Sequence, residues 1–189
     1  MSKLRTFIAV EATAQIKSRA VELIELLAGT LANVKWVEPE EMHWTLKFLG
    51  DVDSNDVPAL CRAATSAVAN LEKFQIRACG SGAFPKVERP RTLWLGVDQG
   101  TEPFVALHDA VQQKLQPLGF RTEHRRFKPH LTIGRVRRSP EGIAELGQLV
   151  AQYSGFDAGE MQVDQLIVYS SRLKADGPTY QSLGRIPLR

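Results

Sequence analysis

The chain has 189 residues, of which 43% are hydrophobic and 24% are charged, and its formal net charge at pH 7 is +3. This size suits one domain with a sizeable core, and average Gly and Pro usage with only two cysteines excludes disordered, collagen-like and disulfide-framed proteins. No apolar run approaches the roughly 20 residues of a membrane span, and the N-terminal apolar stretch is too short for a signal peptide, so we expect a cytoplasmic protein.

Hydrophobic periodicity predicts that strands and helices are interspersed in the first half of the chain. The expected elements are, in order, a strand at 4–10, a helix at 14–31, a strand at 42–49, a helix capped by Asp53 or Ser54, and a strand at 73–79. Periodicity therefore predicts a β-α-β-α-β unit.

The second half repeats this order of elements at an offset of about 85 to 88 positions. The expected elements are a strand at 91–97, a helix beginning at Thr101, a strand at 127–136, a helix starting within 139–141, a strand at 160–169 and a last strand near 180–187. We therefore predict one domain over residues 1–189, built from two repeats at approximately 1–90 and 91–189. Its fold class is α+β with mostly antiparallel sheets.

Positive charge is concentrated in one segment. Residues 121–138 contain seven Arg or Lys residues against a single Glu. Such a segment in an otherwise slightly acidic protein is typical of a surface that meets a polyanion, and a solvated loop is the equal alternative.

A short pattern, His-x-Thr, occurs in the second strand of each half. His43-x-Thr45 and His130-x-Thr132 lie 87 positions apart. Because strand side chains alternate, each pair places an imidazole and a hydroxyl on one sheet face and its apolar neighbours on the other. Polar cross-strand pairs without chemistry are the alternative, but the matched positions in the two repeats favour a shared site.

Two imidazoles facing one cleft can act as an acid and a base near pH 7, because the ordinary pKa of histidine is about 6.5. The nearby hydroxyls can donate hydrogen bonds to the non-bridging oxygens of a phosphate without adding negative charge. The pattern thus favours in-line attack at phosphorus, with one histidine on each side of the phosphoryl group.

These motifs, together with the tract from Gly82 to Pro85 and the strand from Arg91 to Val97, resemble the two-histidine phosphoesterase superfamily. Within it, the chain is similar to the RNA 2′,3′-cyclic phosphodiesterases, also named 2′-5′ RNA ligases. The resemblance runs over nearly the whole chain. It implies two lobes related by a pseudo-two-fold axis, each with a mostly antiparallel sheet and two flanking helices, around a positively charged central cleft.

The resemblance also implies an activity: hydrolysis of RNA 2′,3′-cyclic phosphate ends to 2′-phosphates without metal, ATP or another cofactor, with 2′-5′ ligation as the reverse reaction. By the family's roles, His43 is the proton donor and His130 is the acceptor that activates water. Thr45 and Thr132 hold the phosphate, and Arg135 is a phosphate ligand. The expected partner is an RNA with a cyclic-phosphate end, for example a tRNA fragment, and the expected state is a monomer.

The strands and the basic segment supply further candidate residues. Lys47 and Arg126 are expected to contribute to substrate binding, with a solvated Lys47 equally open. Strict alternation from His130 points Arg135 toward the core, so a bulge or strand end near Gly134 is needed to bring it to the cleft. By the same alternation, Phe48 is expected in the core.

Other candidates are given structural roles. His108 is expected to pack in the core, His124 to lie in an exposed loop, and the tract Gly80-Ser81-Gly82 lacks the remaining glycine and the lysine of nucleotide-binding loops. Two other functions stay open: a module that binds RNA ends without turnover, and a phosphodiesterase of small cyclic nucleotides.

Overall fold

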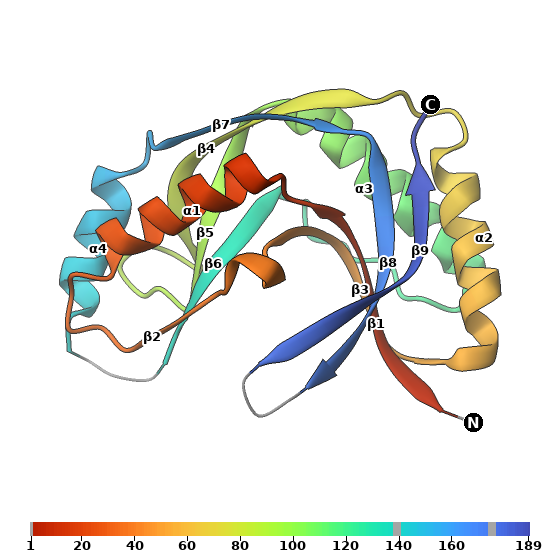
Figure 1. Ribbon diagram of the computed structural model, residues 1–189, viewed down its shortest axis with the longest axis horizontal. Helices are drawn as coiled ribbons and strands as arrows, with labels where there is room; N and C mark the ends of the chain where they lie inside the picture. The colour runs from red at the N-terminus through yellow and green to blue at the C-terminus, as the bar shows by residue number, and fades with distance from the viewer. Residues whose placement is uncertain (1, 138–140, 174–176) are drawn as a thin grey trace.

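The computed structural model describes residues 2–137, 141–173 and 177–189, and Figure 1 shows their arrangement. The strands are β1 (Lys3–Glu11), β2 (Val34–Trp36), β3 (His43–Asp53), β4 (Phe74–Phe84), β5 (Thr92–Gln99), β6 (His130–Val136), β7 (Asp157–Val163), β8 (Gln165–Leu173) and β9 (Pro178–Pro187). The α-helices are α1 (Ala14–Leu27), α2 (Val57–Val68), α3 (Thr101–Leu115) and α4 (Ile143–Gln152). In the described residues, no helix is long and apolar enough to cross a membrane.

The strands form one curved antiparallel sheet in the order β7-β4-β5-β6-β3-β1-β8-β9, and the short β2 pairs with β6. Helices α2 and α3 pack together beside the β3-β1-β8-β9 half, whereas α1 and α4 pack against the β6-β5-β4-β7 half. The two halves meet at a single register pair, Trp44 with Leu131. The predicted α+β fold with antiparallel sheets is confirmed.

The halves of the sheet are not the halves of the chain. Strand β4 belongs to the first half of the sequence but lies next to β5 and β7, and β8 belongs to the second half but lies next to β1. The corresponding orders are β3-β1-β8-β9 and β6-β5-β4-β7, so the two repeats exchange a strand. The assignment of repeats to 1–90 and 91–189 stays a prediction about the organisation of the chain.

Helix α1 shows how the sequence sets an element and its end. The Thr13 hydroxyl accepts a hydrogen bond from the Ile16 backbone N–H at the N-terminus, and the buried face repeats at helical spacing down to Leu27. The helix was predicted to continue to residue 31, but it ends at Leu27 because Gly29 follows and Leu31, at 79% exposed, has no core to join.

One predicted strand was wrong. Residues 160–169 form parts of two strands, β7 and β8, which separate at Asp164 and lie in opposite halves of the sheet. The break follows the burial pattern: Met161 and Val163 are buried at alternate positions, whereas 166–168 are buried consecutively. In addition, β2 was not predicted, and the helix expected to start within 139–141 begins at Ile143, with 138–140 outside the described residues.

Candidate active site

A cavity of about 660 Å³ lies where β3 and β6 meet. Six of the residues expected at the site line it: His43, Thr45, Lys47, His130, Thr132 and Arg135. The cavity thus joins side chains from the two distant motifs.

The single pair between the two strands explains this convergence. Trp44 and Leu131 are buried on the core face, so their neighbours along each strand face the cavity. One step along an antiparallel ladder, His43 falls opposite Thr132, and Thr45 falls opposite His130. The two histidines are therefore diagonal neighbours across the junction of the two strands, and both line the cavity.

Both imidazoles are held in the same way by the backbone two residues before them. His43 Nδ1 lies 2.7 Å from the Glu41 carbonyl oxygen, and His130 Nδ1 lies 2.7 Å from the Lys128 carbonyl oxygen. Because a carbonyl oxygen can only accept, each Nδ1 carries the hydrogen and donates it. Each Nε2 is therefore the nitrogen left to accept or deliver a proton.

Burial controls the charge of both rings. The pKa of His43 is lowered from its ordinary value of 6.5 to about 4, chiefly by burial and also by the cations Lys17 and Arg135, while the hydrogen bond to the Glu41 carbonyl acts in the opposite direction. Burial also lowers the pKa of His130, again helped by cations, here Lys128 and Arg135. The unliganded protein thus holds His43 as a neutral imidazole near pH 7.

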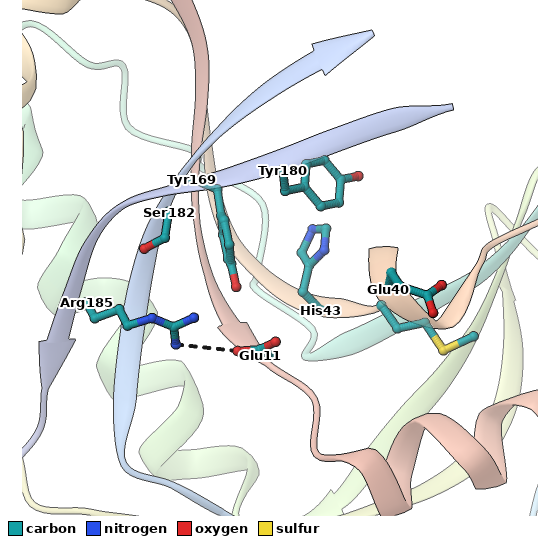
Figure 2. A pocket seen from close by; sticks show the side chains of 8 residues that line it. Glu11, Glu40, His43, Tyr169, Tyr180, Ser182 and Arg185 are labelled. Carbon is teal, nitrogen blue, oxygen red and sulfur yellow. Dashed lines mark ion pairs between the residues drawn. The ribbon is translucent and has the colours of Figure 1, made fainter. Parts of the chain in front are cut away.

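Aromatic rings enclose His43. Phe7 stacks on the imidazole at a centroid distance of 4.7 Å, and Tyr180 meets it edge-on at 5.2 Å. Figure 2 shows the Tyr180 ring beside His43, with Tyr169 on the opposite side of a small cavity of about 210 Å³. Burial raises the pKa of Tyr169 to about 12 and also raises that of Tyr180, so both phenols are neutral hydrogen-bonding groups.

The surroundings of His130 are different. Phe84 meets its ring edge-on at 4.9 Å, and Lys128 lies above the Trp94 ring at 4.2 Å. The Trp94 ring in turn covers Gly82, where a Cβ atom would come within 2.1 Å of it. Gly82 therefore permits close packing of the Trp94 ring.

β-Bulges after each motif re-aim the side chains that follow. In β6 the register against β5 skips Ile133, so Ile133 and Gly134 are both buried and Arg135 turns to the cavity. In β3 the register against β1 skips Leu46, with the same consequence five positions after the histidine. There Phe48 is 60% exposed and lines the cavity, so its predicted place in the core was wrong.

The bulge in β3 also turns Lys47 inward. Only 3% of this residue is exposed, and its Nζ donates to the Gln112 side-chain oxygen at 3.2 Å and to the Arg121 carbonyl oxygen at 2.8 Å. Lys47 is therefore a fixed link between β3 and the basic segment. It lines the cavity together with His43, so the solvated alternative was wrong, and its expected contribution to substrate binding stays a prediction. Arg126 is exposed on that segment, whose neighbouring residues Glu123 and Phe127 form the cavity wall.

The remaining histidines lie where they were expected. His108 is 3% exposed on α3 and stacks on Phe127, whereas His124 is exposed. Within the described ranges, no group of three or more His, Cys, Asp or Glu side chains is arranged to hold a metal ion.

Sequence reasoning missed the aromatic enclosure. Phe7, Tyr169 and Tyr180 come from β1, β8 and β9, far from His43 in the chain, and only the strand order β3-β1-β8-β9 brings them together. Alternation within each strand could have placed them on the motif face, but only after the order of strands was known.

Comparison with known proteins shows the family to which the chain belongs. The family model of the 2′-5′ RNA ligase superfamily matches residues 9–175. The chain belongs to this superfamily. A relative from Methanothermobacter thermautotrophicus, named RNA 2′,3′-cyclic phosphodiesterase, is 33% identical over 96% of this chain and 97% of its own length. A relative of the same name from Archaeoglobus fulgidus is 36% identical over 95% of this chain and 98% of its own.

Solved structures share the fold of this superfamily member over its whole length. The crystal structure of TT0787 of Thermus thermophilus matches with a TM-score of 0.78 and 26% identity, covering 98% of each chain. The crystal structure of Escherichia coli LigT complexed with 3′-AMP matches with a TM-score of 0.75 and 23% identity, again covering 98% of each chain.

Proposed function

We propose that this chain hydrolyses RNA 2′,3′-cyclic phosphate ends to 2′-phosphates, as the names of its relatives suggest. The observation that carries the proposal is the pair of imidazoles on one cavity, each with Nδ1 fixed by a backbone carbonyl and Nε2 left for proton transfer. Binding alone would be served by Arg or Lys, so two histidines held in one tautomer favour catalysis over a passive RNA-end module.

The reaction needs one proton to leave on one side of phosphorus and one to arrive on the other. His130 Nε2 accepts a proton from water, whose oxygen forms a bond to phosphorus in line with the P–O3′ bond. That bond breaks, and His43 delivers its Nε2 proton to the departing O3′. The product is a 2′-phosphate with a free 3′-hydroxyl, and solvent restores the two protonation states. With a 5′-hydroxyl in place of water, the same steps form a P–O5′ bond, break the P–O3′ bond and so join two ends through a 2′-5′ linkage.

His43 needs a source for the proton that it delivers. In the unliganded protein its pKa is about 4, because the ring is buried. A cyclic phosphate carries one negative charge at all relevant pH values, and an anion beside an imidazole favours its charged form. Substrate binding therefore raises the pKa of His43 and loads it with a proton.

Three residues that line the cavity are proposed to bind the phosphoryl oxygens. The hydroxyls of Thr45 and Thr132 donate hydrogen bonds, and the guanidinium of Arg135 compensates the charge that develops at phosphorus. Phe48, exposed on the same cavity wall, offers a stacking surface for the terminal base.

The test is incubation of the purified protein with an oligoribonucleotide that ends in a 2′,3′-cyclic phosphate, in the presence of a chelator. We expect conversion to the 2′-phosphate isomer, identified by comparison with authentic 2′- and 3′-phosphate standards. Saturable binding without conversion would instead support the passive module. Conversion of a mononucleotide 2′,3′-cyclic phosphate alone would support the small-nucleotide phosphodiesterase.

The proposal extends to the setting of the reaction. Both motifs come from one chain and line one cavity, so a monomer holds a complete site. We expect it to act in the cytoplasm, where RNA ends such as those of tRNA fragments are available. Sedimentation with and without an oligonucleotide checks the monomeric state.

A further inference from the structure

The segment between α3 and β6 has little regular structure, yet it is fastened to α3. The Glu123 backbone N–H donates to the Gln112 side-chain oxygen at 2.6 Å, and the Gln112 side-chain amide donates to the Glu123 carbonyl oxygen at 3.3 Å. The Gln112 side chain thus accepts one hydrogen bond from the Glu123 backbone and donates another to it. These two bonds replace those that a neighbouring strand would supply to this segment.

A buried cation fixes the same place from the opposite side. Lys47, from β3, donates to the Arg121 carbonyl oxygen and to the Gln112 side-chain oxygen, and its Nζ lies 3.7 Å from a Glu123 carboxylate oxygen. Burying an ammonium group costs several kcal/mol unless acceptors surround it. Here those acceptors are supplied mainly by the segment itself, so its position is strongly specified.

The segment is held again at its far end. The Phe127 ring stacks on the buried His108 ring at a centroid distance of 4.2 Å with an interplanar angle of 3°. Phe127 also meets Phe104 of α3 edge-on at 6.1 Å. Two fastenings four residues apart therefore hold the chain at Glu123 and at Phe127.

Between the fastenings lies a short basic turn, His124-Arg125-Arg126, whose three residues are all exposed. Among the described residues, no carboxylate lies within ion-pair distance of either arginine. The residues on each side of the turn, Glu123 and Phe127, line the cavity that holds His43 and His130, whereas the turn itself stands outside it. The turn thus borders the cavity, but its own residues do not line it.

We infer that the basic turn binds the phosphodiester backbone of the RNA strand that precedes the terminal cyclic phosphate. This inference rests on the proposed function. Arginine forks match phosphate geometry, and fixed backbone at both ends reduces the ordering cost of using them. A merely solvated loop needs neither a buried lysine nor a stacked histidine. A mononucleotide occupies the cavity alone, whereas an RNA strand continues beyond it to the turn. The turn therefore strengthens the binding of RNA but not of a mononucleotide.

The test compares two substrates in one variant, Arg125→Ala/Arg126→Ala. For an oligoribonucleotide ending in a 2′,3′-cyclic phosphate, we expect KM at low salt to rise by about 5- to 30-fold. The dependence of log affinity on log salt should become shallower by about 1.4, which is roughly 0.7 for each lost single-strand phosphate contact. For a mononucleotide 2′,3′-cyclic phosphate, kcat and KM should change less than twofold, which also shows that the variant is folded.

A charge-matched control separates position from net charge. Lys73→Ala/Lys114→Ala removes two exposed cations elsewhere, from the 69–73 connection and from α3, and should leave both substrates unchanged. Gln112→Ala keeps every charge but releases the segment, and should reproduce part of the oligonucleotide defect. Equal losses on both substrates, or an equal loss in the control, would overturn the inference.

Failure of the proposed function gives results that differ from failure of the inference about the turn. If the wild-type protein converts neither substrate, the catalytic proposal fails, and fluorescence anisotropy with a 3′-phosphorylated oligoribonucleotide still tests the turn. Weaker binding by Arg125→Ala/Arg126→Ala than by the control supports the inference, and equal binding by the two overturns it.

Discussion

Strands β3 and β6 are built on one plan. In each, histidine donates from Nδ1 to the carbonyl two residues before it, and threonine follows two residues later. In each, the strand register skips the third residue after the histidine, so the fifth residue faces the cavity. The backbone therefore presents the same three positions from both sides of the site.

The side chains at and around those positions are not equivalent. Phe7, Tyr169 and Tyr180 surround His43, whereas His130 meets only one of the aromatic rings, Phe84, among the described contacts. The fifth position is Phe48 in one strand and Arg135 in the other. The shared backbone thus sets the geometry of proton transfer, while the unequal neighbours give each imidazole its own environment and each wall its own ligand.

The largest expected effect tests whether both histidines act. His43→Ala and His130→Ala should each lower kcat on a 2′,3′-cyclic phosphate by about 10²- to 10⁴-fold, because general acid and general base catalysis each contribute on that scale. Single-turnover rates with saturating substrate measure it. Full activity in either variant would refute the site.

A change of leaving group then separates the two roles. An activated phosphodiester with a nitrophenolate leaving group needs no proton on departure. His43→Ala should therefore recover much of its activity on this substrate, whereas His130→Ala should not, because water still has to be activated. Equal recovery would show that the two sides are chemically interchangeable.

The next effect concerns the hydroxyls, which the common plan makes equivalent. Thr45→Val and Thr132→Val should each cost roughly 1.5 to 3 kcal/mol in transition-state stabilisation, because a hydrogen bond to a charged phosphoryl oxygen is lost. The comparison of kcat/KM with that of the wild type measures this cost, and Thr→Ser variants should retain most of the activity. A large loss at one position and none at the other would break the symmetry.

Much of this plan was predictable from local sequence. Alternation placed His43 with Thr45 and His130 with Thr132 on one face, and their matched positions in two similar runs of elements predicted a shared cavity. Such inferences succeed because a strand's two-residue period needs no knowledge of its neighbours.

What failed depended on neighbouring strands. Phe48 was assigned to the wrong face because the bulge at Leu46 arises from the pairing of β3 with β1, and pairing does not appear in one strand's sequence. The strand predicted at 160–169 was wrong for a related reason. Its apolar residues belong to two strands, β7 and β8, which lie in opposite halves of the sheet. The aromatic enclosure of His43 required the order of four strands.

A smaller effect tests the unequal fifth position. Phe48→Ala should weaken substrate binding by about 1 to 3 kcal/mol, the range for stacking of one base on an aromatic ring, with kcat nearly unchanged. Phe48→Tyr serves as the control because it keeps the aromatic face. KM for cyclic phosphates that differ only in the base measures the effect. A loss confined to kcat would show that Phe48 acts on the chemistry and does not hold the base.

The smallest effect concerns the enclosure of His43. Tyr180 lines both the main cavity and the small cavity beside His43, so Tyr180→Ala joins them and admits water to the imidazole. Because desolvation is the main cause that lowers the pKa of His43 to about 4, hydration should raise this pKa toward 6.5.

Titration of the His43 ring by NMR in the unliganded protein measures the upward shift, and Tyr180→Phe should leave the pKa unchanged. The His130 pKa should also stay unchanged in both variants, because Phe84, and not Tyr180, meets that ring. An unaltered His43 pKa in Tyr180→Ala would mean that Phe7 and the strands alone keep water away, and that β9 does not contribute to the difference between the two histidines.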